Sequence, residues 1–165
     1  MKLNKKEVKR SGLPALVAKY DENGVVWKRL KEVDHDLLGY LLTCHLMIEH
    51  YIDHFLLTNV SRKLSWKDAG LSFSQKVRLL SNDSRFEHPY DFIPAIADLN
   101  KLRNRFVHDI DIKLQVEDLK PISASITRMS ENKDEILDDP HDILERFTFS
   151  VCAWFGGFIW AASEK

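Results

Sequence analysis

The chain is poor in the residues that build disulfide-rich, β-rich or fibrous proteins. Its 165 residues include two cysteines, six glycines and five prolines. The two cysteines, Cys44 and Cys152, lie far apart in apolar stretches, so they form neither a disulfide framework nor a four-cysteine zinc site. Alternating runs of Val and Ile are scarce while Leu is abundant, which argues against an all-β fold. We expect two buried thiols in a reducing compartment.

The chain also lacks a long apolar run and a secretory signal. The basic residues 1–10 are not followed by an apolar segment. The longest uncharged helical stretch, residues 147–162, is shorter than the roughly 18–20 residues that a membrane span needs. A membrane-associated helical protein is therefore disfavoured, and the sequence predicts a cytoplasmic protein with no membrane contact.

Charge of one sign is not in excess overall, because the formal net charge is -1. The distribution is uneven, however. Residues 1–80 contain 14 Lys and Arg against 9 Asp and Glu, whereas residues 81–165 contain 10 against 16. A protein that coats nucleic acid is usually basic throughout. A nuclease with a local basic surface remains compatible, since steering depends on where the charges lie.

What the chain does contain is helical periodicity over a length typical of one domain, residues 1–165. Residues 1–33 are interpreted as a basic lead-in with a first short helix. Further helices are predicted at 34–59, 72–80, 91–110, 122–132 and 141–163. We predict an all-α, antiparallel helical bundle in which helix 34–59 packs against helix 91–110 and helix 141–163 closes the core.

The helix over 34–59 places apolar residues on one face and an acidic ladder at its edge. The predicted apolar face consists of Leu37, Leu41, Cys44, Ile48, Tyr51, Ile52 and Phe55. His45, Glu49 and Asp53 follow one another at i, i+4 spacing beside that face. His50 and His54 lie on the opposite side. They have the spacing of a zinc-binding pair, but no third ligand has motif spacing, so we predict no metal and no other cofactor.

The helix over 91–110 carries an arginine inside its apolar stripe. The predicted stripe consists of Phe92, Ile96, Leu99, Phe106, Val107 and Ile110, and Arg103 lies at its centre on the helical wheel. A buried guanidinium without a counter-charge is costly, so Arg103 needs an anion. That anion is either a carboxylate of the fold, for which Glu49 is the best candidate, or a substrate phosphate.

Asn104 and His108 follow Arg103 one turn apart on a single flank of the helix. The pattern Arg-Asn-x-x-x-His thus combines a fixed cation, an amide and an imidazole that titrates near neutral pH. Phosphoryl chemistry uses a guanidinium to neutralise phosphate oxygens and an imidazole to move protons. The spacing therefore favours a site that acts on phosphate esters.

The segment Leu102–Asp109 resembles the Arg-Asn-x-x-x-His signature of the HEPN superfamily, which comprises compact α-helical domains, many of them metal-independent ribonucleases. The surrounding pattern, a long helix with an internal Glu followed by a Leu-Ser-Phe-Ser-Gln-Lys helix start, looks most like the branch of mannitol-operon-repressor-like proteins. The resemblance covers roughly residues 30–160.

This resemblance implies roles for the three motif residues in a cleft between two protomers. His108 is the implied proton-transfer residue, Arg103 the stabiliser of the charged phosphorane, and Asn104 the group that orients Arg103 or the phosphate. A toxin subgroup that pairs with nucleotidyltransferase antitoxins carries a tyrosine two residues after the histidine. Here that residue is Ile110, so adenylylation is not expected at this position.

Two further sets of residues have open interpretations. Glu49, with His45 and Asp53, either orients Arg103 in the cleft or forms an ion pair that only closes the bundle. A basic loop at 60–71, together with one arginine in the signature helix, is a candidate RNA contact, with Trp66 either stacking on a base or anchoring the loop. The candidate RNA-binding residues are Arg62, Lys63, Trp66, Lys67 and Arg105.

These observations lead to one expected function and one alternative. The expected function is a metal-independent endoribonuclease, acting as a toxin or phage-defence effector on an RNA substrate. The alternative is a non-catalytic dimeric regulator that keeps the motif as a structural network. Both imply a homodimer, and an antitoxin or regulatory protein is a candidate partner.

Overall fold

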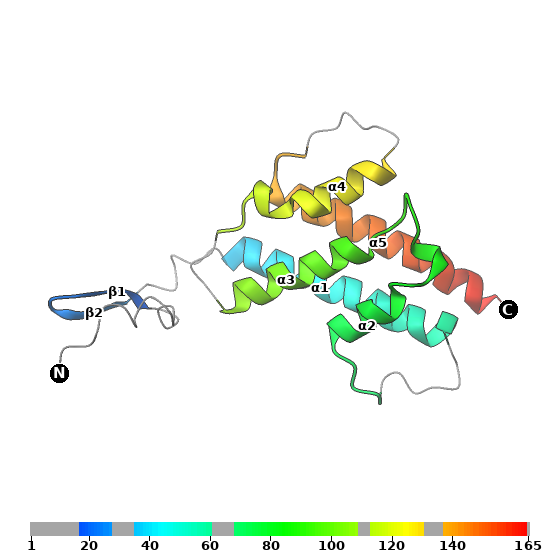
Figure 1. Ribbon diagram of the computed structural model, residues 1–165, viewed down its shortest axis with the longest axis horizontal. Coiled ribbons are helices and arrows are strands. Elements are labelled where there is room, and N and C mark those ends of the chain that lie inside the picture. Colours follow the sequence, from blue (N-terminus) through cyan, green and yellow to red (C-terminus); the bar gives the residue numbers. More distant parts are fainter. Residues whose placement is uncertain (1–16, 28–34, 61–67, 109–112, 131–136, 165) are drawn as a thin grey trace.

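The computed structural model describes residues 17–27, 35–60, 68–108, 113–130 and 137–164 (Figure 1). The described helices form an all-α bundle, which confirms the predicted fold class. Its helices are α1 (His35–Phe55), α2 (Phe73–Leu80), α3 (Ile93–His108), α4 (Lys120–Met129) and α5 (Pro140–Ser163). A π-helical turn η2 (Leu56–Val60) extends α1, and the 3-10 turns η3 (Ser84–Phe86) and η4 (Val116–Leu119) precede α3 and α4.

The prediction of a short helix within residues 1–33 is wrong for the part that the structure describes. Strands β1 (Val17–Asp21) and β2 (Gly24–Trp27) form an antiparallel hairpin there. The turn places Gly24 at φ 118°, a left-handed conformation that glycine adopts without a steric penalty. The Asn23 amide donates to the Asp21 carboxylate at 2.9 Å, which stabilises the turn. Turn chemistry between two short segments therefore prevails over helix formation.

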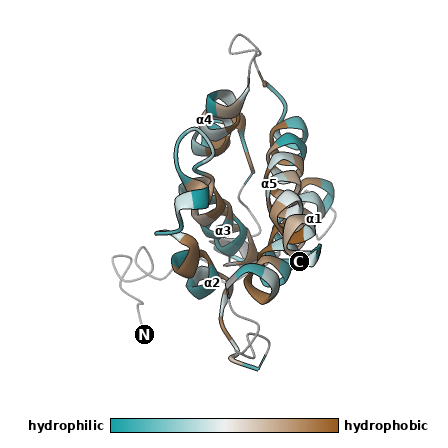
Figure 2. Ribbon diagram, turned by 90° about the vertical axis from the view of Figure 1, so that its right-hand side faces the viewer, coloured by the Kyte–Doolittle hydropathy of each residue, from teal (hydrophilic) through white to brown (hydrophobic). Residues whose placement is uncertain are grey.

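Helices α1 and α5 form the centre of the bundle and run side by side (Figures 1 and 2). They are parallel, because low-numbered residues of one contact low-numbered residues of the other. The Cys44 thiol donates to the Leu144 carbonyl at 3.9 Å, and the rings of Phe55 and Phe155 lie 5.1 Å apart. The chain returns through α2, α3 and α4 before α5 begins, so the antiparallel arrangement applies to α1 and α3 but not to α1 and α5.

The predicted core face of α1 is confirmed. Its apolar residues are buried, apart from Tyr51, which is half-buried. In α3 the core residues Ile96, Leu99 and Phe106 are buried as predicted, but Val107 is 50% exposed and does not belong to the stripe. The buried residues Ala95, Leu99, Leu102 and Phe106 centre the core face of α3 to one side of Val107, so the predicted stripe was placed too far toward that residue. Ile110 lies outside the described residues.

The N-termini of α2 and α5 are capped by polar side chains. At α2 the Ser72 amide donates to Gln75 Oε1 at 2.8 Å, as the predicted capping box requires. At α5 the Asp139 side chain accepts from the amides of His141 and Asp142. Both cysteines are free and buried, as predicted. Across the described ranges, none of the helices combines the length and apolarity needed to span a membrane.

Candidate functional site

Arg103 is half-buried in the last third of α3 and is left short of partners. Its Nη1 donates to the Asn104 side-chain oxygen at 3.0 Å. Its Nε is buried and has no hydrogen-bond partner among the described residues. No ion pair joins it to a carboxylate of the described chain. The guanidinium therefore has no carboxylate partner among the described residues, and its buried Nε–H donor is unused.

The expected pairing of Glu49 with Arg103 is wrong. Glu49 instead accepts from the Lys76 ammonium of α2 at 2.8 Å, and Asp53, one turn further along α1, binds the same ammonium at 2.8 Å. Burial by itself lowers the pKa of Lys76, but its hydrogen bonds to Asp53 and Glu49 outweigh that effect and raise the pKa overall. Lys76 thus clamps α2 onto the acidic ladder of α1 and is the shared cation of both carboxylates, in place of Arg103.

His45, the third member of the ladder, faces α3 rather than Lys76. It is 4% exposed, and its Nε2 lies 3.1 Å from the side-chain oxygen of Asn100. Because an amide oxygen only accepts, this contact places the ring proton on Nε2. The imidazole also packs on Phe73 with ring centroids 4.1 Å apart. Burial lowers the pKa of His45, and the nearby charge of Arg103 lowers it further.

Together these residues form one polar strip where α1, α2 and α3 meet. We use the name "polar strip" for His45, Glu49, Asp53, Lys76, Asn100, Arg103 and Asn104. The strip combines a neutral imidazole, a paired lysine and an incompletely satisfied arginine. Sequence analysis missed Lys76 and Asn100. For Asn100 a signal existed, since it lies one turn before Asn104 on the same helix.

Open space adjoins the polar strip at two places, beside Asn100 and beside Asp53 and Lys76. Asn100 lines a pocket of about 250 Å³ between α2 and α3, together with Ser74, Arg78 and Lys101. Asp53 and Lys76 line a second pocket of about 390 Å³, together with His50 and His54. A ligand that follows the strip thus meets cationic and hydrogen-bonding side chains at both places.

The remaining predicted site residues have varied positions. Asn104 is exposed and touches Arg103. His108 ends α3, and its side chain lies outside the described residues. Arg105, predicted to bind RNA, forms an ion pair with Asp118 of η4 at 2.7 Å instead of standing free. The other predicted RNA contacts, Arg62, Lys63, Trp66 and Lys67, lie outside the described residues.

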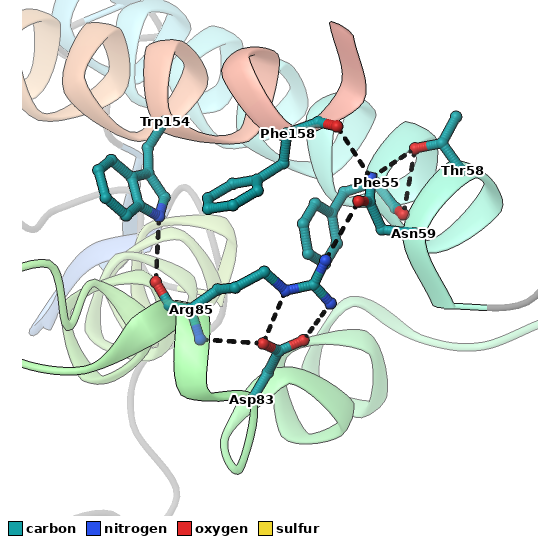
Figure 3. Close-up of polar contacts among 7 residues, drawn as sticks. All are labelled: Phe55, Thr58, Asn59, Asp83, Arg85, Trp154 and Phe158. Atoms are coloured by element: carbon teal, nitrogen blue, oxygen red, sulfur yellow. Dashed lines mark hydrogen bonds and ion pairs between the residues drawn. The ribbon is translucent and has the colours of Figure 1, made fainter. Parts of the chain in front are cut away.

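Arg85 shows what a fully satisfied arginine looks like in the same protein (Figure 3). Its Nε and Nη2 donate to the two oxygens of the Asp83 carboxylate, and its Nη1 donates to the side-chain oxygen of Asn59 at 3.1 Å. The guanidinium lies 4.5 Å from the centre of the Phe55 ring, and the Arg85 carbonyl accepts from the Trp154 indole at 3.2 Å. This side chain ties η3 to α1 and α5, which is a structural role.

The contrast between the two arginines identifies the group that is available to a ligand. Arg85 uses donors on all three guanidinium nitrogens within the protein, whereas Arg103 has one neutral partner and a buried Nε with none. Among the described residues, no group of three or more His, Cys, Asp or Glu side chains is arranged to hold a metal ion. What the strip offers is therefore an arginine suited to an oxyanion, beside a neutral imidazole.

Comparisons with protein-family models, with curated proteins and with solved structures find no match to this chain. The resemblance to the HEPN superfamily accordingly rests on the Arg-Asn-x-x-x-His segment and its position in α3.

Proposed function

We propose that the protein is a metal-independent endoribonuclease of the HEPN type. The observation that carries the proposal is the state of Arg103, whose buried Nε has no partner and whose charge has no described carboxylate. A phosphate offers the planar set of acceptors that a guanidinium fork binds best. An RNA backbone supplies that phosphate together with the neighbouring 2′-OH that serves as nucleophile.

The proposed reaction uses the three motif residues in separate roles. His108 accepts the proton of the 2′-OH as the 2′ oxygen forms a bond to phosphorus. The bond from phosphorus to the 5′ oxygen then breaks, and the His108 imidazolium returns its proton to that leaving oxygen. The products are a 2′,3′-cyclic phosphate and a 5′-hydroxyl end. Arg103 stabilises the charge on the phosphorane oxygens, and the 3.0 Å hydrogen bond from Arg103 to Asn104 supports an orienting role for Asn104.

The two pockets beside the polar strip support a single-stranded substrate. The pocket beside Asn100 has Arg78 and Lys101 at its margin, where they can contact phosphates that flank the scissile bond. Ser74 and Asn100 offer polar groups to a base in the same pocket. In the proposed complex the strand lies along α2 and α3 and reaches Arg103, which follows Asn100 by one turn of α3.

The proposal includes a homodimer in which the strips of two protomers face one groove, and cytoplasmic action as a toxin or phage-defence effector with an antitoxin or regulatory partner. Support for self-association, as distinct from the facing of the two strips, comes from α5. Residues such as Phe147 and Phe155 fill the core of one protomer, but Phe149 and Trp160 remain 74% and 65% exposed. Exposed aromatics of this size are common at protein interfaces.

A second candidate is a non-catalytic dimeric regulator, and the ion pairs of Lys76 favour it. Glu49 and Asp53 are both engaged by Lys76, and His45 by Asn100, so much of the polar strip already serves to join three helices. In this interpretation Arg103 contacts a partner rather than a scissile phosphate.

The deciding experiment measures cleavage of varied RNAs in excess EDTA by wild type and three variants. His108→Ala should lose about 10²–10⁴-fold in rate, the usual contribution of general acid–base catalysis. Arg103→Lys should also fail, because a point charge does not replace the planar fork. Arg128→Lys, an exposed arginine in the last turn of α4, is the matched control and should cleave normally. Uncut RNA with wild type, or unchanged cleavage by His108→Ala, contradicts the nuclease and favours the regulator.

A further inference from the structure

The pocket between α2 and α3 has apolar walls that suit the faces of a planar ring. Its volume is about 250 Å³, and its walls are Phe73 and Val77 of α2 and Ala97 of α3. Phe73 and Val77 are 8% and 5% exposed, because most of each side chain belongs to the core. A nucleobase has apolar faces and a polar edge, and proteins that bind single-stranded RNA hold it by both. The identity of a base held here therefore depends on the polar groups that line the same pocket.

Asn100 offers this pocket hydrogen-bond donors. Its side-chain oxygen lies 3.1 Å from His45 Nε2 and accepts the proton of that ring nitrogen. Its Nδ2 has no hydrogen-bond partner among the described residues. Because the contact with His45 occupies the oxygen and fixes the amide, the amino group, with its two N–H donors, remains for a ligand in the pocket that Asn100 lines.

Ser74 offers the same pocket an acceptor. The Ser72 hydroxyl donates its only proton to Gln75 Oε1 at 2.9 Å. The hydroxyl oxygen of Ser74 lies 3.2 Å from that of Ser72, so Ser74 is the donor in this contact. A hydroxyl has one proton, and the proton of Ser74 is thereby used within the protein. What Ser74 has left for a ligand is a lone pair, which accepts from an N–H group.

The margin of the pocket is positively charged. Arg78 is exposed in the last turn of α2 and has no ion pair among the described residues. Lys101 pairs with Asp98 at 2.7 Å, and an ammonium group has three N–H donors, so further donors remain. The described residues that line this pocket include no Asp or Glu. This excess of positive donors favours a carbonyl oxygen on the base over an amino group, whose hydrogens also carry positive charge.

We propose that the pocket selects a base with a carbonyl oxygen beside a ring N–H, which is uracil or guanine. The carbonyl oxygen accepts from Asn100 and faces the charge of Arg78, and the ring N–H donates to Ser74. Adenine and cytosine instead place an amino group beside an unprotonated ring nitrogen, so their amino hydrogens meet the donors of the pocket.

The selected base adjoins the scissile phosphate. Arg103 follows Asn100 by one turn of α3, so a phosphate bonded to the same nucleotide lies within reach of the guanidinium. The inference rests on the proposed ribonuclease, because it names the sequence that this site cleaves. Its binding step is nevertheless measurable without any cleavage.

The binding test titrates the full-length protein with the 3′,5′-bisphosphates of uridine, guanosine, cytidine and adenosine, following backbone amide NMR shifts. Each probe carries a phosphate on both sides of the base, so it serves whichever phosphate Arg103 holds. The uridine and guanosine probes should give saturable shifts in α2 and α3 and bind about tenfold more tightly than the other two, the discrimination expected for a paired hydrogen-bonding edge. Equal binding of the four probes, or no saturable shift, would overturn the proposal.

Three variants separate base selection from general attraction of phosphate. Arg78→Gln should lower the ratio of uridine to cytidine affinity severalfold, because it removes the charge that faces the carbonyl oxygen. Ala97→Leu should fill the pocket and abolish the preference. Arg128→Gln, which removes an exposed arginine of α4, is the matched control and should keep the wild-type ratio. An equal change of ratio in Arg78→Gln and Arg128→Gln would overturn the proposal.

Asn100→Asp tests the direction of the hydrogen bonds. It keeps an oxygen for His45 but replaces the amino donors with an acceptor, so the preference should reverse toward cytidine and adenosine. All four probes carry the same phosphates, so the added negative charge cancels in the ratio. A variant that still prefers uridine would overturn the proposal. If its thermal midpoint shows that Asn100→Asp does not fold, the ratio measured for Arg78→Gln decides.

Cleavage of oligoadenylates that carry a single U, G or C distinguishes failure of this inference from failure of the ribonuclease. Cutting next to U and G should be about tenfold faster than cutting next to C or between adenosines. Cleavage without preference would overturn the base selection and leave the ribonuclease intact. Uncut RNA, together with preferential binding of the uridine and guanosine bisphosphates, would support the pocket and contradict the ribonuclease.

Discussion

His45 of α1 and Asn100 of α3 are joined by a hydrogen bond of 3.1 Å between His45 Nε2 and the side-chain oxygen of Asn100. The contact holds a neutral imidazole of α1 against α3, one turn before Arg103. Because burial and the charge of Arg103 both lower the pKa of His45, protonation of this ring opposes the folded state.

The first prediction concerns the pH dependence of stability. Since the folded-state pKa of His45 lies below its unfolded value, the unfolded chain binds more protons as the pH falls through about 6.5. The contribution of neutral His45 to the free energy of unfolding is fully present above that pH. It is lost progressively below it, by at most about 1.4 kcal/mol per pH unit. Urea denaturation of wild type and His45→Gln between pH 5 and 8 should show a flatter profile for the variant. His50→Gln, on the exposed side of α1, should keep the wild-type slope.

The second prediction concerns the clamp between α1 and α2. Lys76→Met leaves Glu49 and Asp53 without their shared cation and should lower the free energy of unfolding by about 1–2 kcal/mol, a value reduced for the exposure of both carboxylates. Lys101→Met removes an exposed ion pair with Asp98 and should cost no more than about 0.5 kcal/mol. Equal losses in chemical denaturation would show that the Lys76 clamp contributes no more than a surface pair.

The third prediction compares the effects of substituting Arg85 and Arg103 on stability and on RNA cleavage. Arg85→Lys should lower the free energy of unfolding by about 2 kcal/mol, because it breaks a two-sided carboxylate contact and the bond to Asn59. Arg103→Met should leave stability within about 0.5 kcal/mol of wild type, since its Nε has no partner to lose, yet abolish RNA cleavage. Thermal denaturation and the cleavage assay together show which arginine is structural and which is functional. A large loss of stability in Arg103→Met would identify that arginine as part of the scaffold.

The fourth prediction concerns self-association. Light scattering at tens of micromolar protein should report the mass of a dimer. Trp160→Glu places a charge on the exposed apolar side of α5 and should shift the equilibrium to monomers. Thr127→Glu, on the exposed surface of α4, controls for added charge. A monomeric wild type, or a dimer that Trp160→Glu leaves intact, would remove α5 as the interface.

Much of the fold was predictable because helices have a fixed period. The 3.6-residue repeat correctly assigned the buried face of α1, and the Ser72–Gln75 pattern predicted the start of α2 within one residue. The β-hairpin at Val17–Trp27 was missed even though Asn23-Gly24 signals a turn. Short strands carry too few residues for their alternation to outweigh an expectation of helix.

Most members of the candidate site were predictable, but Lys76, Asn100 and the pairings between residues were not. The sequence by itself determined that His45, Glu49 and Asp53 share one edge of α1 and that Arg103 faces the core side of α3, because both follow from the geometry of a single helix. Only the tertiary structure decided that Lys76 takes both carboxylates and leaves Arg103 without one. The physical reason is the short distance over which an ion pair forms. An ion pair forms within about 4 Å, and which charges come that close depends on how whole helices dock, which the period of each helix does not specify.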